Sequence, residues 1–210
     1  MFETVTTLLD WLGVVVFAVT GALVASRKEM DIVGFALLGT ATGIGGGTLR
    51  DVLLDQPVFW IREPAYLVAC VVVSGIVFFT AHIPQSRYRA LLWLDAVGMA
   101  LFAVSGAERA SLAGVNGIVA VAMGVVTATF GGIIRDLLGG EIPVILRREI
   151  YVTAALLGAA AFVSLTALGA GRDLSTAIGF ALALLIRAAA LQRGWSLPRY
   201  RPRPGAQDEQ

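Results

Sequence analysis

The chain has 210 residues, of which 57% are hydrophobic, and its mean hydropathy is +0.80. Soluble domains average about 45–50% apolar residues, so this composition excludes an ordinary soluble domain and predicts a membrane protein. A net charge of +1 and a single cysteine, Cys70, give no support for a nucleic-acid partner or an intrachain disulfide.

Seven apolar segments follow one another along the chain. A helix needs about 20 apolar residues to cross a bilayer. Segments of suitable length lie at 5–25, 32–54, 65–82, 91–108, 117–138, 151–169 and 174–192. Short connections with turn-forming residues, such as the stretch from Pro57 to Pro64, separate them. We therefore predict an all-α membrane protein with seven transmembrane helices in one domain over 1–196, followed by a disordered cytoplasmic tail over 197–210.

Basic residues are distributed unevenly between the two sides of the predicted membrane domain. The side that holds the N-terminus has three, Arg62, Arg109 and Arg172, and the other side has eleven. Six of the eleven remain when the seventh segment and the tail are left out: Arg27, Lys28, Arg87, Arg89, Arg147 and Arg148. Because basic loops stay in the cytoplasm, we predict a multi-pass protein of the inner (cell) membrane with the N-terminus outside and the C-terminus in the cytoplasm.

Two parts of the chain resemble each other at a spacing of 85 positions. The series Gly39, Thr42, Gly46, Gly47, Arg50, Asp51 recurs as Gly124, Thr127, Gly131, Gly132, Arg135, Asp136. Repeat one covers about 5–84 and repeat two about 90–170, and each contains three predicted helices. Because three is an odd number, the second copy enters the membrane from the opposite face, which predicts inverted repeats plus a seventh helix at about 174–192. Ancestry alone would explain a repeat, but the repeated residues include the most polar ones of the apolar segments, which favours a shared function.

Glycines gather in the second and fifth segments. The candidate pore glycines are Gly43, Gly45, Gly46, Gly47, Gly131 and Gly132. Each glycine costs a helix about 1 kcal/mol relative to alanine. One interpretation is close helix packing through small residues spaced four apart. The other, which we favour at this point, is a discontinuous helix whose freed backbone groups line a cavity at the membrane centre.

An arginine and an aspartate follow the glycines in both copies, as Arg50-Asp51 and Arg135-Asp136. Charged residues inside a membrane are costly and are usually functional. One alternative is that the two arginines extend to a nearby membrane–water interface without any further role. That alternative does not explain why an acidic residue accompanies each arginine.

Two further aspartates, Asp10 and Asp95, begin the apolar parts of the first and fourth segments. The inverted topology places Asp10 at the same level as Arg50, and Asp95 at the same level as Arg135. We therefore predict two charge clusters beside the pore, Asp10/Arg50/Asp51 outside and Asp95/Arg135/Asp136 inside, each kept stable by ion pairing. The alternative is that Asp10 and Asp95 cap helix N-termini.

Four segments carry a resemblance to a known family: FAVTGAL (17–23), GIGGGTLRD (43–51), FGGIIRD (130–136) and PVILRREIYV (143–152). They resemble the bacterial members of the trimeric intracellular cation (TRIC) channels, also labelled a glycine-transporter-like membrane domain. The resemblance implies seven transmembrane helices and a homotrimer with one pore per protomer. It implies conduction of monovalent cations, chiefly potassium, through a pore between the two repeats. The pore would be kinked at the glycines of the second and fifth helices, with the Arg-Asp pairs in or beside it.

The residues and the resemblance together favour a potassium-type cation channel. A secondary transporter of a small solute such as an amino acid shares the inverted repeat and the glycine-rich helices, so it stays as the alternative. We see no catalytic constellation and expect no enzyme. No cofactor is expected; the expected ligands are the permeant cations and, as an open option, bound lipid. The expected partners are the lipid bilayer and further copies of the chain. Selectivity for cations follows from the resemblance alone.

Overall fold

The computed structural model describes residues 2–84, 86–146 and 150–196, with the side chains from Thr6 onward. The described residues form eight α-helices and one short 3-10 helix. The elements are α1 (Phe2–Arg27), α2 (Ile32–Leu53), α3 (Phe59–Arg62), α4 (Ala65–Thr80), α5 (Arg87–Leu112), α6 (Gly117–Leu138), η1 (Val144–Leu146), α7 (Val152–Ala167) and α8 (Arg172–Arg193). The predicted tail at 197–210 lies outside the described residues.

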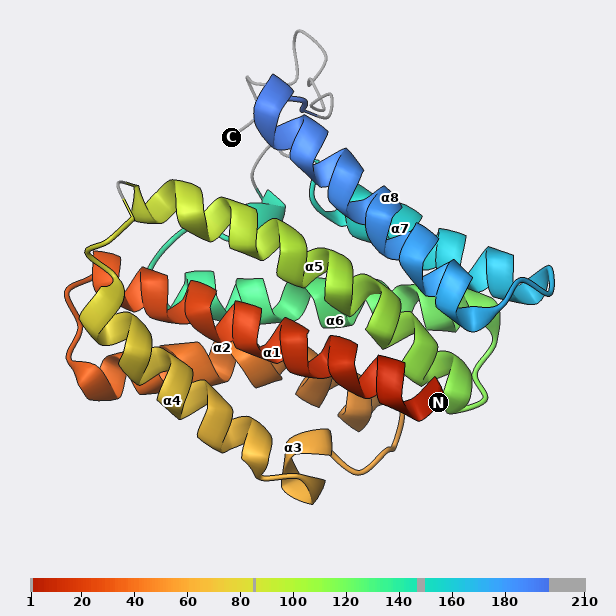
Figure 1. Ribbon diagram of the computed structural model, residues 1–210, viewed down its shortest axis with the longest axis horizontal. Helices are drawn as coiled ribbons and strands as arrows, with labels where there is room; N and C mark the ends of the chain where they lie inside the picture. The colour runs from red at the N-terminus through yellow and green to blue at the C-terminus, as the bar shows by residue number, and fades with distance from the viewer. Residues whose placement is uncertain (1, 85, 147–149, 197–210) are drawn as a thin grey trace, which may run out of the picture.

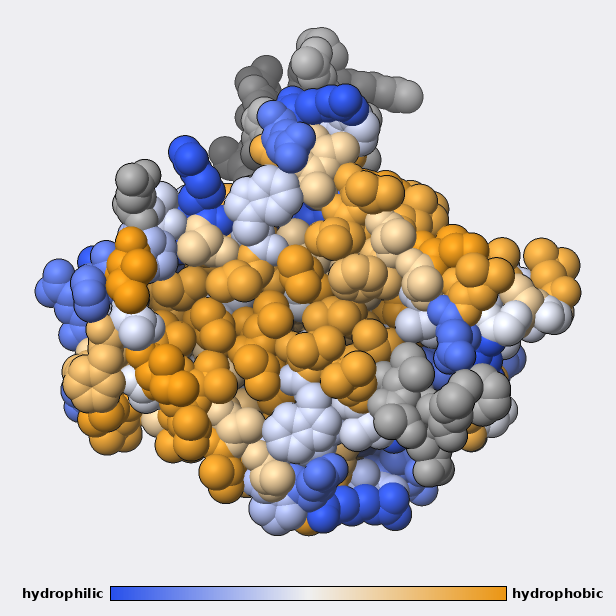
Figure 2. Space-filling view, viewed as in Figure 1, coloured by the Kyte–Doolittle hydropathy of each residue, from blue (hydrophilic) through white to orange (hydrophobic). Residues whose placement is uncertain are grey.

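Each of the seven predicted transmembrane segments falls on one helix of 16 to 26 residues. Five of these helices, α1, α2, α5, α6 and α8, are long and apolar enough to cross a membrane, and α4 and α7 are shorter apolar helices. Side chains such as Leu37 and Phe79, which are 66% and 69% exposed, form an apolar outer surface. Figure 2 shows this surface over the middle of the helices, with hydrophilic residues near the helix ends. An all-α membrane fold therefore agrees with the prediction.

Both repeats begin and end their central helix in the same way. The side chains of Asp31 and Asn116, 85 positions apart, accept the N–H groups of Gly34 and Val119 and so cap the N-termini of α2 and α6. Both helices end in a residue with positive φ, which is Asp55 after α2 and Gly140 after α6. Local chemistry thus fixes the length of both helices at 22 residues.

The helices pack as two matching halves that run in opposite directions. In the first half α1 packs on α2 and α4, and in the second half α5 packs on α6 and α7. The halves meet where α1 lies against α5 and α2 lies against α6. Figure 1 shows α1 and α5 side by side with opposite chain directions. The remaining helix, α8, packs on α5 and α7. The structure therefore has the predicted pair of inverted three-helix repeats and a seventh long helix.

The glycines of α2 and α6 bring the backbones of the two helices into contact. A methyl group at Gly46 would collide with the carbonyl oxygen of Thr127, and one at Gly131 would lie 2.5 Å from the carbonyl oxygen of Thr42. Both helices continue through these positions without interruption. The expected discontinuous helix is therefore wrong, and the alternative of close packing through small residues is correct. Packing prevails because a glycine lets two backbones approach in a way that no larger residue permits.

The same close packing occurs upstream of the crossing. Methyl groups at Gly39 and Gly43 would meet the carbonyl oxygens of Ala18 and Val14 on α1 at 3.0 and 2.9 Å. The spacing of four residues puts Gly39 and Gly43 on one face of α2. The expected cavity at the centre is consequently filled by backbone contacts between α2 and its neighbours.

Candidate functional site: two clusters of buried charge

The Arg-Asp dipeptide makes the same local structure in both halves. Nε of Arg50 donates to Oδ1 of Asp51 at 2.8 Å, and Nε of Arg135 donates to Oδ1 of Asp136 at 2.9 Å. The second oxygen of each aspartate accepts a backbone N–H eight residues further on, from Phe59 or Val144, both at 2.9 Å. Each aspartate thus holds the side chain of the preceding arginine in place, and it also holds the segment that follows α2 or α6.

Both arginines are buried. Arg50 is 2% exposed and Arg135 is fully buried. The alternative in which these arginines extend to the membrane surface is therefore wrong, because their guanidinium groups are bonded inside the protein. A buried guanidinium needs such partners, since an unpaired charge is costly there.

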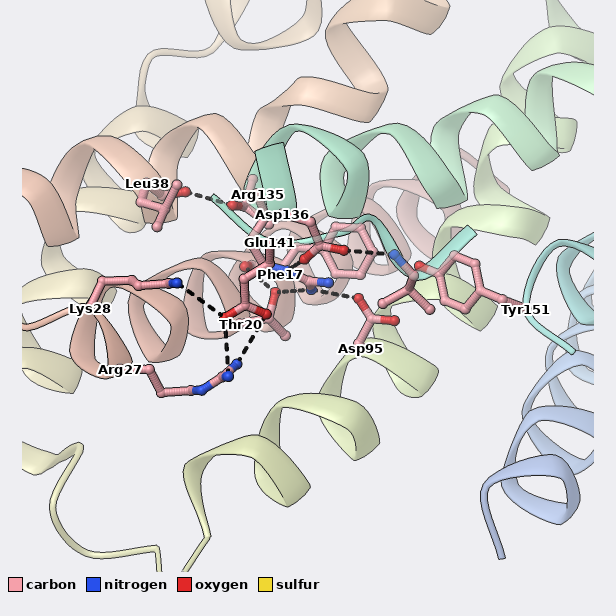
Figure 3. Close-up of polar contacts among 12 residues, drawn as sticks. Phe17, Thr20, Arg27, Lys28, Leu38, Asp95, Arg135, Asp136, Glu141 and Tyr151 are labelled. Carbon is pink, nitrogen blue, oxygen red and sulfur yellow. Dashed lines mark hydrogen bonds and ion pairs between the residues drawn. The ribbon is translucent and has the colours of Figure 1, made fainter. Parts of the chain in front are cut away.

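The Arg135 end of the bundle, defined by Asp95, Arg135 and Asp136, forms the predicted cluster. Nη1 of Arg135 donates to Oδ1 of Asp95 at 2.6 Å and to the Thr20 hydroxyl at 3.1 Å. Figure 3 shows Arg135 between Asp95, Asp136 and Thr20. The cluster therefore joins α5 and α6 of one half to α1 of the other.

The Arg50 end of the bundle, defined by Arg50 and Asp51, differs from the prediction. Asp10 does not pair with Arg50; its Oδ2 accepts hydrogen bonds from Nε and Nη2 of Arg109 at 2.9 and 2.8 Å. Sequence reasoning missed Arg109 because the position 85 residues earlier holds Val24, so no repeat pattern marks it. The signal that could have found it is its place at the end of the fourth segment, on the same side of the membrane as Asp10.

Neither Asp10 nor Asp95 caps a helix. Asp10 lies inside α1, and Asp95 lies inside α5, whose N-terminus is capped by Ser86. The capping alternative is therefore wrong. The helices extend beyond the apolar segments because polar residues at their ends remain helical.

The Arg50 end opens into a polar pocket of about 430 Å³. Its walls include residues of α1, α2, α3, α4 and α5 and of the segments that follow α2, α3 and α5: Thr6, Thr7, Arg50, Asp51, Leu54, Gln56, Pro57, Phe59, Arg62, Glu63, Tyr66, Arg109, Leu112 and Ala113. This pocket lies at one end of the helix bundle, whereas the glycine-lined cavity was expected at its centre.

The Arg135 end carries a second layer of charge. Glu141 lies 3.0 Å from Nη2 of Arg27 and 3.9 Å from Nζ of Lys28, so it ties the end of α1 to the segment after α6 (Figure 3). The repeat-related positions at the other end are the uncharged Gln56, Leu112 and Ala113, which line the open pocket.

The remaining candidate glycines have different surroundings. Methyl groups at Gly45 and Gly47 would meet the side chains of Ile134 at 2.6 Å and Phe59 at 2.7 Å. A methyl group at Gly132 would have ordinary contacts of 3.4–3.6 Å with the Tyr151 hydroxyl, Oδ1 of Asp95 and Nη2 of Arg135. Gly132 therefore faces the charge cluster. Tyr151, which sequence reasoning also missed, completes its surroundings.

These features define an all-α membrane protein built from inverted repeats with buried ion pairs, a class that contains channels and carriers. The family model described as Glycine transporter matches the chain twice, over residues 7–82 and 92–167. The chain therefore belongs to this family, and the structural matches described below place it among the TRIC channels. As predicted, this is a family of channels and not of enzymes.

The similarity to individual proteins extends over nearly the whole chain. The UPF0126 inner membrane protein YadS of Escherichia coli K12 is 41% identical over 197 residues, which cover 91% of this chain and 94% of the relative. The TRIC trimeric intracellular cation channel orthologue from Rhodobacter sphaeroides is 68% identical, with a TM-score of 0.90, and the match covers 91% of this chain and 100% of the other. A prokaryotic TRIC channel in 0.5 M KCl is 32% identical, with a TM-score of 0.86, and the match covers 94% and 100% of the two chains.

Proposed function

We propose that this protein is an inner-membrane channel for monovalent cations of the potassium type. The observation that carries the proposal is the 68% identity to a TRIC cation channel orthologue over 91% of the chain. The buried charges support it, because buried ionisable groups in a membrane domain usually mark a route for ions or solutes.

The cation path runs through each protomer between the two repeats. It starts in the pocket at the Arg50 end, follows the contact between α2 and α6, and leaves past Arg135. Along this proposed path the backbone contacts at Gly46 and Gly131 form one constriction, and the Arg135 cluster forms a second. Opening therefore requires α2 and α6 to bend at their glycines and move apart. Glycine permits such bending at low cost because it has no side chain to rearrange.

The orientation follows from the basic residues. The Arg50 end, together with the N-terminus, faces outside, and the Arg135 end, with Arg27 and Lys28, faces the cytoplasm. The open pocket is then the outer mouth, and the Glu141 ion pairs close the inner mouth. The inner membrane is the location given by the description of the Escherichia coli relative.

The working assembly is a homotrimer in the lipid bilayer. Two similar solved proteins are described as trimeric or TRIC channels. Small residues on several helix faces permit the close helix contacts that such association needs in lipid.

A carrier of a small solute is the second candidate. The description of the family model as Glycine transporter favours it, and so does a structure with a polar pocket at one end and ion pairs at the other. Recordings from purified protein in a planar bilayer separate the two candidates. We expect unitary potassium currents that survive when glycine is absent. Saturable glycine uptake into liposomes without unitary currents would support the carrier and contradict the channel.

A further inference from the structure

Asp10 on α1 lies level with Ser105 on α5 at the Arg50 end of the bundle. The register of these two antiparallel helices follows from Gly13, because a methyl group there would collide with the Phe102 ring. Asp10 comes three residues before Gly13 and Ser105 three residues after Phe102, so both lie about 4.5 Å further toward the Arg50 end. Both side chains are buried, and neither Oδ1 of Asp10 nor Oγ of Ser105 has a hydrogen-bond partner among the described residues.

The repeat-related pair at the other end of α1 and α5 has a partner. A methyl group at Gly98 would collide with the Phe17 ring, and three residues further toward the Arg135 end Asp95 comes level with Thr20. Nη1 of Arg135 donates to Oδ1 of Asp95 at 2.6 Å and to the Thr20 hydroxyl at 3.1 Å. One guanidinium therefore bridges α1 and α5 at that end.

Arg50 is the repeat-related counterpart of the bridging arginine, but its guanidinium has a different position. Nε and Nη2 of Arg50 both lie on Oδ1 of Asp51, at 2.8 and 2.7 Å. Arg135 bonds Asp136 through Nε, while its Nη1 makes the bridge. A turn of the Arg50 guanidinium that keeps the Nε bond to Asp51 would give it the arrangement of Arg135.

Arg50 and the unsatisfied pair lie at the same pocket. Arg50 and Arg109 both line it, and Arg109 holds the other oxygen of Asp10, Oδ2, at 2.9 Å. The Tyr66 hydroxyl, also in the wall, is within electrostatic reach of all three charged groups, so these groups lie near one another. Ser105 precedes Arg109 by one helical turn and therefore lies deeper in the bundle.

We propose that Arg50 gates the outer mouth by moving its guanidinium between two positions. In the position in this structure it bonds Asp51 alone. In the second position Nε stays on Asp51, and Nη1 donates to Oδ1 of Asp10 and to Oγ of Ser105, in the same way as Arg135 bridges the other end. The second position satisfies two buried atoms and gives up one bond, and it narrows the inner side of the pocket by joining α2 to α1 and α5. The effect on current rests on the proposed cation conduction, whereas the movement itself does not.

Arginine labelling tests the movement without any current. Phenylglyoxal modifies guanidinium groups, and mass spectrometry of the digested protein gives the rate at each arginine. Arg109→Gln leaves Oδ2 of Asp10 without its cation, so the carboxylate should draw Arg50 into the second position and slow its labelling about fivefold. Adding Ser105→Ala should restore most of the rate. Arg62, which is exposed and lines the same pocket, is the internal reference.

The direction of this change distinguishes the movement from a general loosening. Without a second position, removing the Arg109 side chain only widens the pocket, and Arg50 should then react faster or at the same rate. Either of these two results would overturn the proposal. Asp10→Asn in the Arg109→Gln background should abolish the slowing, because the charge that attracts Arg50 is gone.

Unitary currents test the gating effect. Ser105→Ala removes a hydroxyl that the second position needs, so the ratio of open to closed time should rise about tenfold. In an Arg50→Gln background the same change should have no effect. Ser74→Ala is the matched control, because the Ser74 hydroxyl is also buried without a partner among the described residues but lies on α4 against Gly39.

The two measurements separate failure of the gate from failure of the channel. Labelling that changes as expected, together with an unchanged open-to-closed ratio in Ser105→Ala, would remove Arg50 from gating. Unaltered protein that gives no unitary currents would contradict the channel and leave the labelling test of the movement in force.

Discussion

The two ends of the bundle share one scaffold and differ in charge. At both ends an arginine bonds the next aspartate, and that aspartate bonds a backbone N–H eight residues further on. At the Arg135 end the arginine also forms an ion pair with Asp95. At the Arg50 end the corresponding aspartate, Asp10, pairs with Arg109 instead. The repeated part therefore holds the helix ends in place, and the part that differs sets which charged residues meet at each end.

The largest expected effect on stability comes from removing the arginine of the Arg135 end. Arg135→Ala leaves two buried carboxylates without their cation, which should cost about 3–5 kcal/mol of unfolding free energy. Arg50→Ala should cost less, because Asp51 borders the pocket and water can reach it. The measurement is thermal unfolding of both variants in detergent. Equal losses would show that the two ends do not differ in the way described.

The next effect concerns the backbone contact between the halves. Gly46→Ala drives a methyl group into the Thr127 carbonyl, and this overpacking should cost about 1–3 kcal/mol. Gly45→Ala is the matched control, because its methyl group meets only the end of the flexible Ile134 side chain. Unfolding free energies of the two variants, measured in parallel, check the difference. If Gly46→Ala leaves the unfolding free energy unchanged, α2 and α6 separate more easily than their contact indicates.

Arg109→Gln tests the residue that pairs with Asp10 at the Arg50 end. The change leaves the Asp10 carboxylate buried without its charged partner and should cost about 1–3 kcal/mol. The double variant Asp10→Asn with Arg109→Gln should recover part of this loss, because the buried carboxylate is then gone. The two single variants and the double variant form a thermodynamic cycle, and strictly additive losses would contradict the pairing of Asp10 with Arg109.

The smallest effect on stability is expected from changing Glu141, which forms the second layer of charge at the Arg135 end. Arg27 and Lys28 are partly exposed, so Glu141→Gln should cost only about 0.2–1 kcal/mol. The same change should raise the open probability in bilayer recordings, because it releases α1 from the segment after α6. If the open probability of Glu141→Gln stays the same, these ion pairs do not close the inner mouth.

The sequence predicts the helices and their inverted arrangement well, because both follow from local patterns. Apolar length identifies the five long helices and the two shorter ones, α4 and α7, and an odd number of helices per repeat inverts the second copy. The Asp95–Arg135 pair was also predictable, because topology places both residues at one level of the membrane.

The partner of Asp10 and the role of the glycines were not predictable in the same way. Arg109 has no counterpart in the first repeat, so only the packing of α1 against α5 brings it to Asp10. The propensity cost of a glycine is the same whether the helix breaks or packs closely, so Gly46 alone does not decide between the two. The carbonyl of Thr127, which lies 81 positions away, decides it.

The most direct test of the path is current block in a Gly132→Cys variant in which Cys70 is replaced by Ala. Unitary potassium currents are recorded before and after addition of a small cationic thiol reagent. We expect the reagent to reduce or abolish the current of this variant and to leave that of a Val33→Cys variant, on the exposed surface of α2, unchanged. A modified Gly132→Cys protein whose current stays at its initial value would contradict a cation path between the two repeats.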